Sequence, residues 1–380
     1  MQYHFPRTLG QKQAKERLGM ALSQNRFPHA ILVHGEPGLG QHALLLDLAE
    51  ILACSSEKQR PCSTCSACKA FRNAALDSMH YLIPLAKKEK ESAAEGDRDG
   101  DEPPALGAAL IEELASLILQ WHEQPYHFRG PEKAMVRVPQ TRELLGRLGY
   151  AQSGGSRIVL IPYLEDLNPE AANALLKTLE EPSPNVYFLI ASEHRAALLP
   201  TLLSRCLHLG LAPLSSGEME EAAEKLAPDE KTSRLLPFAE GSPGTLMALL
   251  EHGETLLEEA SQFLAAATAS DWRVFSEYAS GPASAGLEET ARLLQFLLRC
   301  VRLHHTLKAN HPLPPLREPG FRWTARALES AGWDATLAGY IGHLEDVPDL
   351  QAFATYVENA LKAVKAYTRP QAALDRKSVV

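Results

Sequence analysis

The sequence predicts an α/β fold followed by an all-α part, and three observations support this prediction. The first half contains short apolar runs typical of buried strands, at Ala30–His34, Ile158–Ile161 and Val186–Ala191. A glycine-rich turn joins the first run to a helix-forming segment at Ala43–Ala53, which is an order typical of a parallel sheet. After Leu209 the strand-like runs stop and helical segments dominate to the end.

Two further helices are predicted around these strands. Residues 11–25 have the spacing of an amphipathic helix. The segment Asn168–Glu181 has clear helix start and stop signals. Asn168 can cap the helix, Pro169 suits the first helical position and Pro182 ends the helix. The face of this helix that we expect to pack on the sheet consists of Ala171, Ala174, Leu175, Thr178 and Leu179.

Residues 86–134 are expected to interrupt the α/β core as an insertion. The part from 86 to 105 is charged and low in apolar residues, which predicts a mobile surface segment. The run that follows is helical by spacing, and one side of it carries Leu110, Ile111, Leu114, Leu117, Ile118 and Trp121. Later breaks near Gly241–Gly244 and His311–Gly320 divide the helical part into a small domain and a larger one.

Length and charge limit the possible functions. The chain has 380 residues, enough for two or three domains. It carries 38 Lys and Arg against 47 Asp and Glu, a net charge of −9, so it is expected to bind nucleic acid poorly on its own. The N-terminal residues show no basic region followed by an apolar stretch, and no apolar run approaches the length of a membrane span. We therefore expect a cytoplasmic protein without membrane contact.

The glycine-rich turn after the first strand resembles a phosphate-binding loop that lacks its chemistry. Gly35, Gly38 and Gly40 fit the G-x-x-x-x-G part of such a loop, whose backbone N–H groups bind anions at a helix N-terminus. Lysine and a hydroxyl residue should follow, to bind the outer phosphates and Mg²⁺. Gln41 and His42 stand there instead. The loop taken alone could also be a simple strand–helix turn.

The second half of an ATPase site is missing as well. A working site needs carboxylates at the end of a neighbouring strand, but the strand Ile158–Ile161 ends in Pro162 and Tyr163. Glu165 and Asp166 follow. They could supply the required carboxylates only if two extra residues were accommodated at the end of the strand. Hydrolysis of ATP at this site is therefore not expected.

Four cysteines lie close together in the sequence and predict a metal site. Cys54, Cys62, Cys65 and Cys68 can supply four thiolates, as in a closed tetrahedral zinc site. Iron–sulfur ligation is the rival interpretation, although Cys68 is followed by Lys69 instead of the proline seen in ferredoxin motifs.

Several ordered motifs resemble the AAA+ clamp-loader family of bacterial DNA polymerase III. They are NALLKTLEEP at Asn173–Pro182, NRFPHAILVHGEPGLG at Asn25–Gly40 and the Ser204-Arg205-Cys206 triplet, together with Gly10-Gln11, Gly241–Gly244 and the tail Arg369–Ala372. The resemblance implies an AAA+ domain over 1–209 with a zinc module at 54–68. It further implies a helical lid over 210–253 and a helical collar domain over 254–380. It also favours structural zinc over iron at the cysteines.

Departures from the family pattern indicate which members the chain resembles. In the ATP-hydrolysing members, Asp and Glu would stand at Pro162 and Tyr163, and a sensor arginine would stand at Thr245. With Gln41 and His42, these departures form a coherent set. The chain is therefore more similar to members without a competent site than to the gamma and tau subunits, and ATP binding is doubtful.

The resemblance implies a non-hydrolysing stator that helps ATPase subunits to load the sliding clamp on primed DNA. Within the Ser204-Arg205-Cys206 motif, Arg205 would act as an arginine finger on ATP bound to a neighbouring subunit, although an isolated arginine is more often a solvated cation. The implied partners are gamma or tau and delta subunits, with the clamp and DNA reached through the complex. Two alternatives remain: a gamma- or tau-like ATPase with an atypical active site, and an independent zinc-dependent DNA-binding module.

Overall fold

In the computed structural model the described residues are 1–86, 108–131, 134–149, 155–228, 232, 235–268, 292–293, 295–302, 354–355 and 357–359. They belong to two compact units, one of residues 1–222 with 241–244 and the other of residues 223–240 with 245–380. The predicted break at 311–320, the tail at 369–372 and most of the predicted collar lie outside the described residues. The domain boundaries at 209 and 253 stay predictions.

The first unit contains a five-stranded parallel sheet. Its strand order is β4-β5-β6-β2-β7, and the strands are β2 (Ala30–His34), β4 (Met79–Tyr81), β5 (Arg157–Ile161), β6 (Val186–Ser192) and β7 (Leu207–Gly210). A second, two-stranded sheet pairs β1 (Gln2–Tyr3) with β3 (Gln59–Arg60). The three predicted strands are confirmed, whereas the short strands β4 and β7 at the two edges were not predicted.

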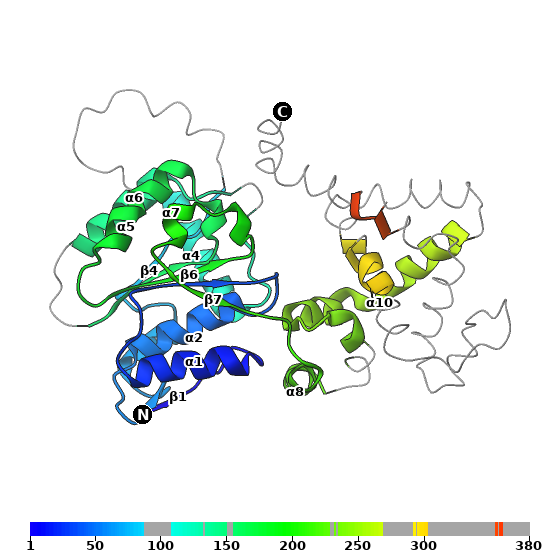
Figure 1. Ribbon diagram of the computed structural model, residues 1–380, viewed down its shortest axis with the longest axis horizontal. Helices are drawn as coiled ribbons and strands as arrows, with labels where there is room; N and C mark the ends of the chain where they lie inside the picture. The colour runs from blue at the N-terminus through cyan, green and yellow to red at the C-terminus, as the bar shows by residue number, and fades with distance from the viewer. Residues whose placement is uncertain are drawn as a thin grey trace. The chain divides into compact units, whose positions relative to one another are not determined.

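Helices cover both faces of the sheet (Figure 1). On one face lie α1 (Lys12–Ser23), α2 (Gln41–Ala53), α3 (Ser66–Arg72) and α4 (Ala108–Glu123). On the other lie α5 (Val138–Gly149), α6 (Pro169–Glu180) and α7 (Pro200–Leu203). The mixed α/β fold with a parallel sheet is thus confirmed.

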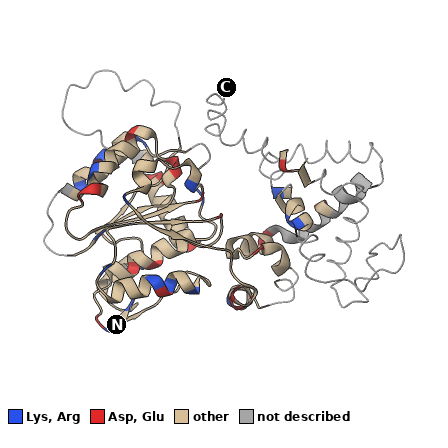
Figure 2. Ribbon diagram, in the orientation of Figure 1, with Lys and Arg blue, Asp and Glu red and all other residues tan. Residues whose placement is uncertain are grey.

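The side chains of the strands alternate between two hydrophobic cores. On β2, Ile31 and Val33 belong to the core under α2, while Ala30 and Leu32 belong to the core under α6. Because every one of these side chains is buried, the whole run is apolar, as expected for a parallel strand covered on both faces. Figure 2 shows charges of both signs on the outer helices and an almost uncharged sheet.

Helix α6 begins as the sequence predicts. The Asn168 carboxamide oxygen accepts a hydrogen bond from the Ala171 N–H at 2.7 Å, and Pro169 occupies the first helical position. Ala171, Leu175 and Leu179 are buried against the sheet. The predicted cap is confirmed, and so are three residues of the predicted face, whereas Ala174 and Thr178 are only half-buried and the buried Ala172 was not predicted.

Helix α4 departs from its predicted face at one position. Leu110, Leu117 and Trp121 are buried, but Ile111 is 55% exposed. Ile111 lies about 100° around the helix from Leu110, and at this position the side chain faces solvent. Residues 87–107, the main part of the charged segment, lie outside the described residues.

From residue 216 onwards the described residues include α8 (Ser216–Leu226), the 3-10 helix η4 (Leu236–Ala239) and α10 (Pro243–Thr268), and residues 295–302 are also helical. Within the second unit, the rings of Phe238 and Phe296 lie 5.3 Å apart. Arg299 forms an ion pair with Glu240 at 3.1 Å. The remaining elements of the first unit are the 3-10 helices η2 (Leu164–Asp166) and η3 (Arg195–Ala197).

Candidate functional site

The phosphate-type loop connects β2 to α2, as predicted. Gly38 and Gly40 adopt positive φ angles of 80° and 100°, conformations that glycine reaches without steric cost. Because Gly40 turns the chain directly into the helix, α2 begins at Gln41, two residues before the predicted start at Ala43. The backbone therefore has the form of an anion cradle at a helix N-terminus.

The side chain of Gln41 points into the loop and binds the loop backbone. Its side-chain Nε2 donates to the carbonyl oxygens of Gly35 at 2.7 Å and Glu36 at 2.8 Å. The residue is only 2% exposed, so the amide sits inside the loop and does not extend towards solvent. A lysine at this position would carry a positive charge to a phosphate, whereas Gln41 supplies a neutral group bound to the loop itself.

His42 is buried under the loop and contributes no charge there at neutral pH. Its Nε2 donates to the Pro162 carbonyl oxygen at 3.0 Å, and its ring lies 4.8 Å from the Tyr163 ring and 5.7 Å from the Phe128 ring, centroid to centroid. Burial lowers the pKa of His42 to about 4, despite the opposing effect of the Pro162 carbonyl. A buried neutral imidazole is a poor ligand for Mg²⁺, which prefers oxygen.

The end of β5 supplies aromatic packing where an ATPase would place acids. The Tyr163 hydroxyl donates to the Phe128 carbonyl oxygen at 2.7 Å, and the residue is buried. Glu165 lies in the 3-10 helix η2, where its carboxylate accepts a hydrogen bond from the Glu193 N–H at 2.8 Å. The pairing of β5 with β6 runs in unbroken register from Arg157 to Ile161. Strand β5 therefore shows no two-residue shift of the kind that would bring Glu165 and Asp166 to the position of the missing carboxylates.

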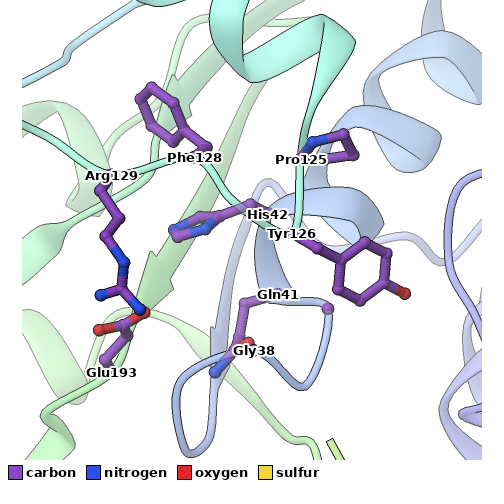
Figure 3. A pocket seen from close by; sticks show the side chains of 9 residues that line it. Gly38, Gln41, His42, Pro125, Tyr126, Phe128, Arg129 and Glu193 are labelled. Atoms are coloured by element: carbon purple, nitrogen blue, oxygen red, sulfur yellow. The ribbon is translucent and has the colours of Figure 1, made fainter. Parts of the chain in front are cut away.

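Tyr126 is a feature of the site that sequence reasoning missed. Its hydroxyl accepts a hydrogen bond from the Leu9 N–H at 2.7 Å, and a Cβ added to Gly40 would lie 2.9 Å from that hydroxyl. Figure 3 shows the segment from Pro125 to Arg129 beside the loop, with Arg129 pointing towards Glu193. The sequence signal is weak, because Tyr126 stands in an insertion that matches no motif.

A cavity of about 10 Å³ remains between this segment and the loop. That is about the space that one water molecule needs. The residues around it are Gly38, Gly40, Gln41, His42, Pro125, Tyr126, Phe128, Arg129 and Glu193.

The predicted Gly241–Gly244 turn also reaches the loop. The Gly244 N–H donates to the Gly38 carbonyl oxygen at 2.9 Å, and the Ser242 hydroxyl donates to the Pro37 carbonyl oxygen at 3.4 Å. Thr245, the position of the expected sensor, is the next residue and belongs to the second unit. Ser192 is buried at the end of β6, where its hydroxyl accepts a hydrogen bond from the His194 N–H.

Arg205 lies on the other face of the sheet, just after α7. Its Nη1 donates to the Thr201 carbonyl oxygen at 2.6 Å and to the Ser204 hydroxyl at 3.2 Å. Its Nη2 forms an ion pair with Glu180 at the end of α6. The side chain of Arg205 is 27% exposed, so the guanidinium is oriented by three acceptors while part of it reaches solvent. Cys206 is buried in the core under α6, and burial raises its pKa to about 11.

The four clustered cysteines come together in space. The sulfur atoms of Cys54, Cys62, Cys65 and Cys68 all lie within 4.8 Å of one another. Tetrahedral zinc with Zn–S bonds of about 2.3 Å places its sulfurs about 3.8 Å apart, so the cluster could hold such an ion after small movements.

Hydrogen bonds around the sulfurs also suit a metal. Backbone N–H groups donate to sulfur at 3.4 Å in three cases, from Cys62 to Cys54, from Cys65 to Cys62 and from Cys68 to Cys65. Donors from Thr64 and Cys65 lower the pKa of Cys62 to about 5, which favours the thiolate that binds metals. Burial raises the pKa of Cys54 and Cys68, an effect that a bound cation would oppose.

The cysteine module packs against the rest of the first unit through Phe71 and Arg7. Phe71 of α3 is fully buried, and the guanidinium of Arg7 lies 5.1 Å from the centroid of its ring. Arg7 also forms ion pairs with Asp47 at 3.2 Å and Glu50 at 2.7 Å on α2. The module therefore packs as part of the core.

No helix among the described residues is long and apolar enough to span a membrane.

Comparison with known proteins agrees with the resemblance found in the sequence. A family model described as "DNA polymerase III, delta subunit" matches residues 10–215. A DNA polymerase III subunit delta' from Haemophilus influenzae is 26% identical over 236 residues, covering 62% of this chain and 58% of the relative. The subunit delta' from Pseudomonas aeruginosa is 37% identical over 166 residues, covering 42% of this chain and 50% of the relative.

A relative of another type also matches. The DNA polymerase III subunit tau from Escherichia coli is 25% identical over 368 residues, covering 96% of this chain and 47% of the relative. The chain spans about half the length of the curated relatives it matches.

Proposed function

The chain belongs to the DNA polymerase III delta-subunit family, and we propose that it is a non-hydrolysing clamp-loader subunit of the delta-prime type. In this role it is a stator against which ATPase subunits move as they load the sliding clamp on primed DNA. The partners would be gamma or tau and delta subunits. The clamp and the DNA are reached through the assembled complex, as the net charge of −9 suggests.

The filled phosphate loop is the observation that carries this proposal. Gln41 binds the loop carbonyls, His42 is buried and neutral, and Tyr163 packs where a carboxylate would be needed. The lysine, the hydroxyl group and the carboxylate that ATP hydrolysis needs are thus each replaced by a neutral group with its own partner. The subunit would belong to a polymerase holoenzyme without being an enzyme by itself.

Arg205 is proposed to act on a neighbour's ATP. Transition states of phosphoryl transfer carry negative charge that an arginine from another subunit can stabilise. Thr201, Ser204 and Glu180 hold the guanidinium in one orientation at the protein surface, and a planar cation held in this way suits an interface. Ser204 supports the side chain, and Cys206 anchors the motif in the core.

Zinc is proposed as a structural cofactor bound by Cys54, Cys62, Cys65 and Cys68. The spacing of the sulfurs and their backbone N–H donors support this. All four positions of a tetrahedral ion would be filled by thiolates, so no open position remains for chemistry. Because these thiols must stay reduced, a cytoplasmic location belongs to the proposal.

The domain roles follow the family pattern. We propose an AAA+ domain over 1–209, a helical lid over 210–253 and a collar over 254–380 that contacts the other subunits. The Gly241–Gly244 turn bound to Gly38 supports a lid segment next to the loop.

The experiment that tests this function combines the isolated chain with the other subunits. The purified chain should show no ATP turnover, and it should join gamma and delta subunits into a complex whose DNA-stimulated ATPase rate exceeds that of the same mixture without it. Failure to join that complex, or an unchanged rate on joining it, would contradict the proposal.

The tau relative that covers 96% of the chain favours one alternative, an ATPase with unusual ligands. In that case the isolated chain would turn over ATP, and substitution of Gly40 or Glu165 would abolish the activity. We expect no turnover before or after either substitution.

A further inference from the structure

We propose that Tyr126 is a built-in occupant of the phosphate-loop site, and that its side chain keeps adenine nucleotides out. The missing lysine alone would only weaken nucleotide binding, whereas a side chain in the site blocks it. The proposal does not rest on the clamp-loader role or on Arg205, because it concerns only the loop and its neighbours within the first unit.

The ring of Tyr126 covers the N-terminus of α2. A Cβ built on Gly40 would lie 2.9 Å from the hydroxyl and 3.2 Å from each of the two nearest ring carbons. The ring therefore lies directly on the Gly40 backbone. This backbone forms the part of the loop where N–H groups and the helix dipole would attract a phosphate.

The hydroxyl of Tyr126 is anchored on the opposite side. It accepts the Leu9 N–H at 2.7 Å. The preceding residue is fixed in turn, because buried Asp47 accepts the Thr8 N–H at 2.9 Å and the Thr8 hydroxyl at 2.7 Å. Tyr126 therefore lies between the Gly40 backbone and an N-terminal segment that is itself hydrogen-bonded to α2.

The segment that follows Leu9 is also held in place. Gly10 and Gln11 both have positive φ angles, and Gln11 Nε2 donates to the carbonyl oxygens of Leu39 at 3.3 Å and Ala212 at 2.8 Å. The bond to Leu39 joins the N-terminal segment to the phosphate loop, and the bond to Ala212 joins it to the segment after β7.

The cavity left between Tyr126 and the loop is small. The cavity of about 10 Å³ beside Tyr126 is enough for about one water molecule. On another side, the Gly244 N–H binds the Gly38 carbonyl oxygen, and a Cβ at Gly244 would lie 3.3 Å from the Tyr126 carbonyl oxygen. The Tyr126 side chain thus contacts Leu9 and Gly40, and its backbone carbonyl lies beside the Gly244 turn.

The test is a binding titration of the full chain with Mg²⁺ and a fluorescent ADP analogue. Four proteins are compared: wild type, Tyr126→Ala, Gln41→Lys and the Tyr126→Ala/Gln41→Lys double variant. Wild type and Gln41→Lys should show no saturable binding up to millimolar analogue. The two proteins with Tyr126→Ala should bind, with a Kd at least tenfold below that limit and lowest in the double variant.

Two results would overturn the proposal. One is micromolar binding by the wild type, and the other is binding by Gln41→Lys equal to that of the double variant. A matched control is Tyr187→Ala, which removes a half-buried tyrosine on β6 away from the loop and should not create binding.

A second measurement decides the matter even if Tyr126→Ala fails to fold. Tyr126→Phe keeps the ring and removes only the hydroxyl, so it should still exclude the analogue. In this variant the Leu9 amide should exchange its hydrogen at least tenfold faster than in wild type. Unchanged exchange at Leu9 would show that the hydroxyl does not anchor the ring, and would contradict the proposal.

Discussion

Replacing His42 by phenylalanine should make the protein less sensitive to acid. The wild-type imidazole is buried among aromatic rings, and its pKa is lowered to about 4, mainly by burial. In the unfolded chain the pKa is about 6.5. Between these two values the unfolded state binds a proton that the folded state does not. The free energy of unfolding therefore falls as the pH falls from about 6.5 to 4.

The magnitude follows from the two pKa values. Between pH 6.5 and pH 4 the titration of His42 lowers the free energy of unfolding by about 3 kcal/mol. Between pH 7 and pH 5 the decrease is about 2 kcal/mol. His42→Phe keeps an aromatic ring but loses this titration. It also loses the hydrogen bond to Pro162, which should cost about 1 kcal/mol at pH 7.

The assay is urea unfolding of wild type and His42→Phe at pH 7 and pH 5, followed by tryptophan fluorescence. Trp121 lies next to His42, with ring centroids 6.0 Å apart, and should report the transition. The pKa of His122 is also lowered to about 4 by burial, but this contribution is common to both proteins and cancels in the difference. Exposed His194→Phe is the control and should keep the wild-type pH dependence. Equal pH dependence in wild type and His42→Phe would refute the reasoning.

Three further predictions concern other parts of the first unit. Asn168→Ala removes the cap that binds the Ala171 N–H and should lower the free energy of unfolding by about 1 kcal/mol, whereas Asn168→Asp should not. Gly244→Ala places a Cβ 2.7 Å from the Gly38 Cα, so hydrogen exchange at the Gly244 turn should accelerate; unchanged protection would contradict the contact. Metal analysis should return one zinc per wild-type chain and none in Cys65→Ser, and iron in the wild type would refute the assignment.

Much of the first unit could be predicted from local patterns. The apolar run Ala30–His34 is a buried strand because helices cover both faces of the sheet. The Asn168-Pro169 pair and Pro182 marked α6 because capping chemistry is local. The cysteines of the candidate metal site could be found from spacing alone, since they lie within one short segment and their sulfur atoms come together in space.

Other features depend on contacts between distant segments and were not predictable in this way. Tyr126 reaches the phosphate loop only because the chain returns to α2 after α4. The sequence has Gln41 where a phosphate-binding loop is expected to carry lysine, but the inward bonds of Gln41 to Gly35 and Glu36 require the folded loop. The strand β7 has only four residues, and three of them are not buried, so it lacks the apolar signature of a central strand.

The most direct test of the central claim is the effect of Arg205→Ala on ATP turnover in the reconstituted complex. Arg147→Ala is the matched control, because Arg147 also forms an exposed ion pair, with Glu143 on α5. With complex assembly verified for both variants, single-turnover hydrolysis at the adjoining ATPase subunit should fall roughly a thousandfold for Arg205→Ala. It should be unchanged for Arg147→Ala. Full hydrolysis at that site in an assembled Arg205→Ala complex would contradict the claim that this chain completes a neighbour's active site.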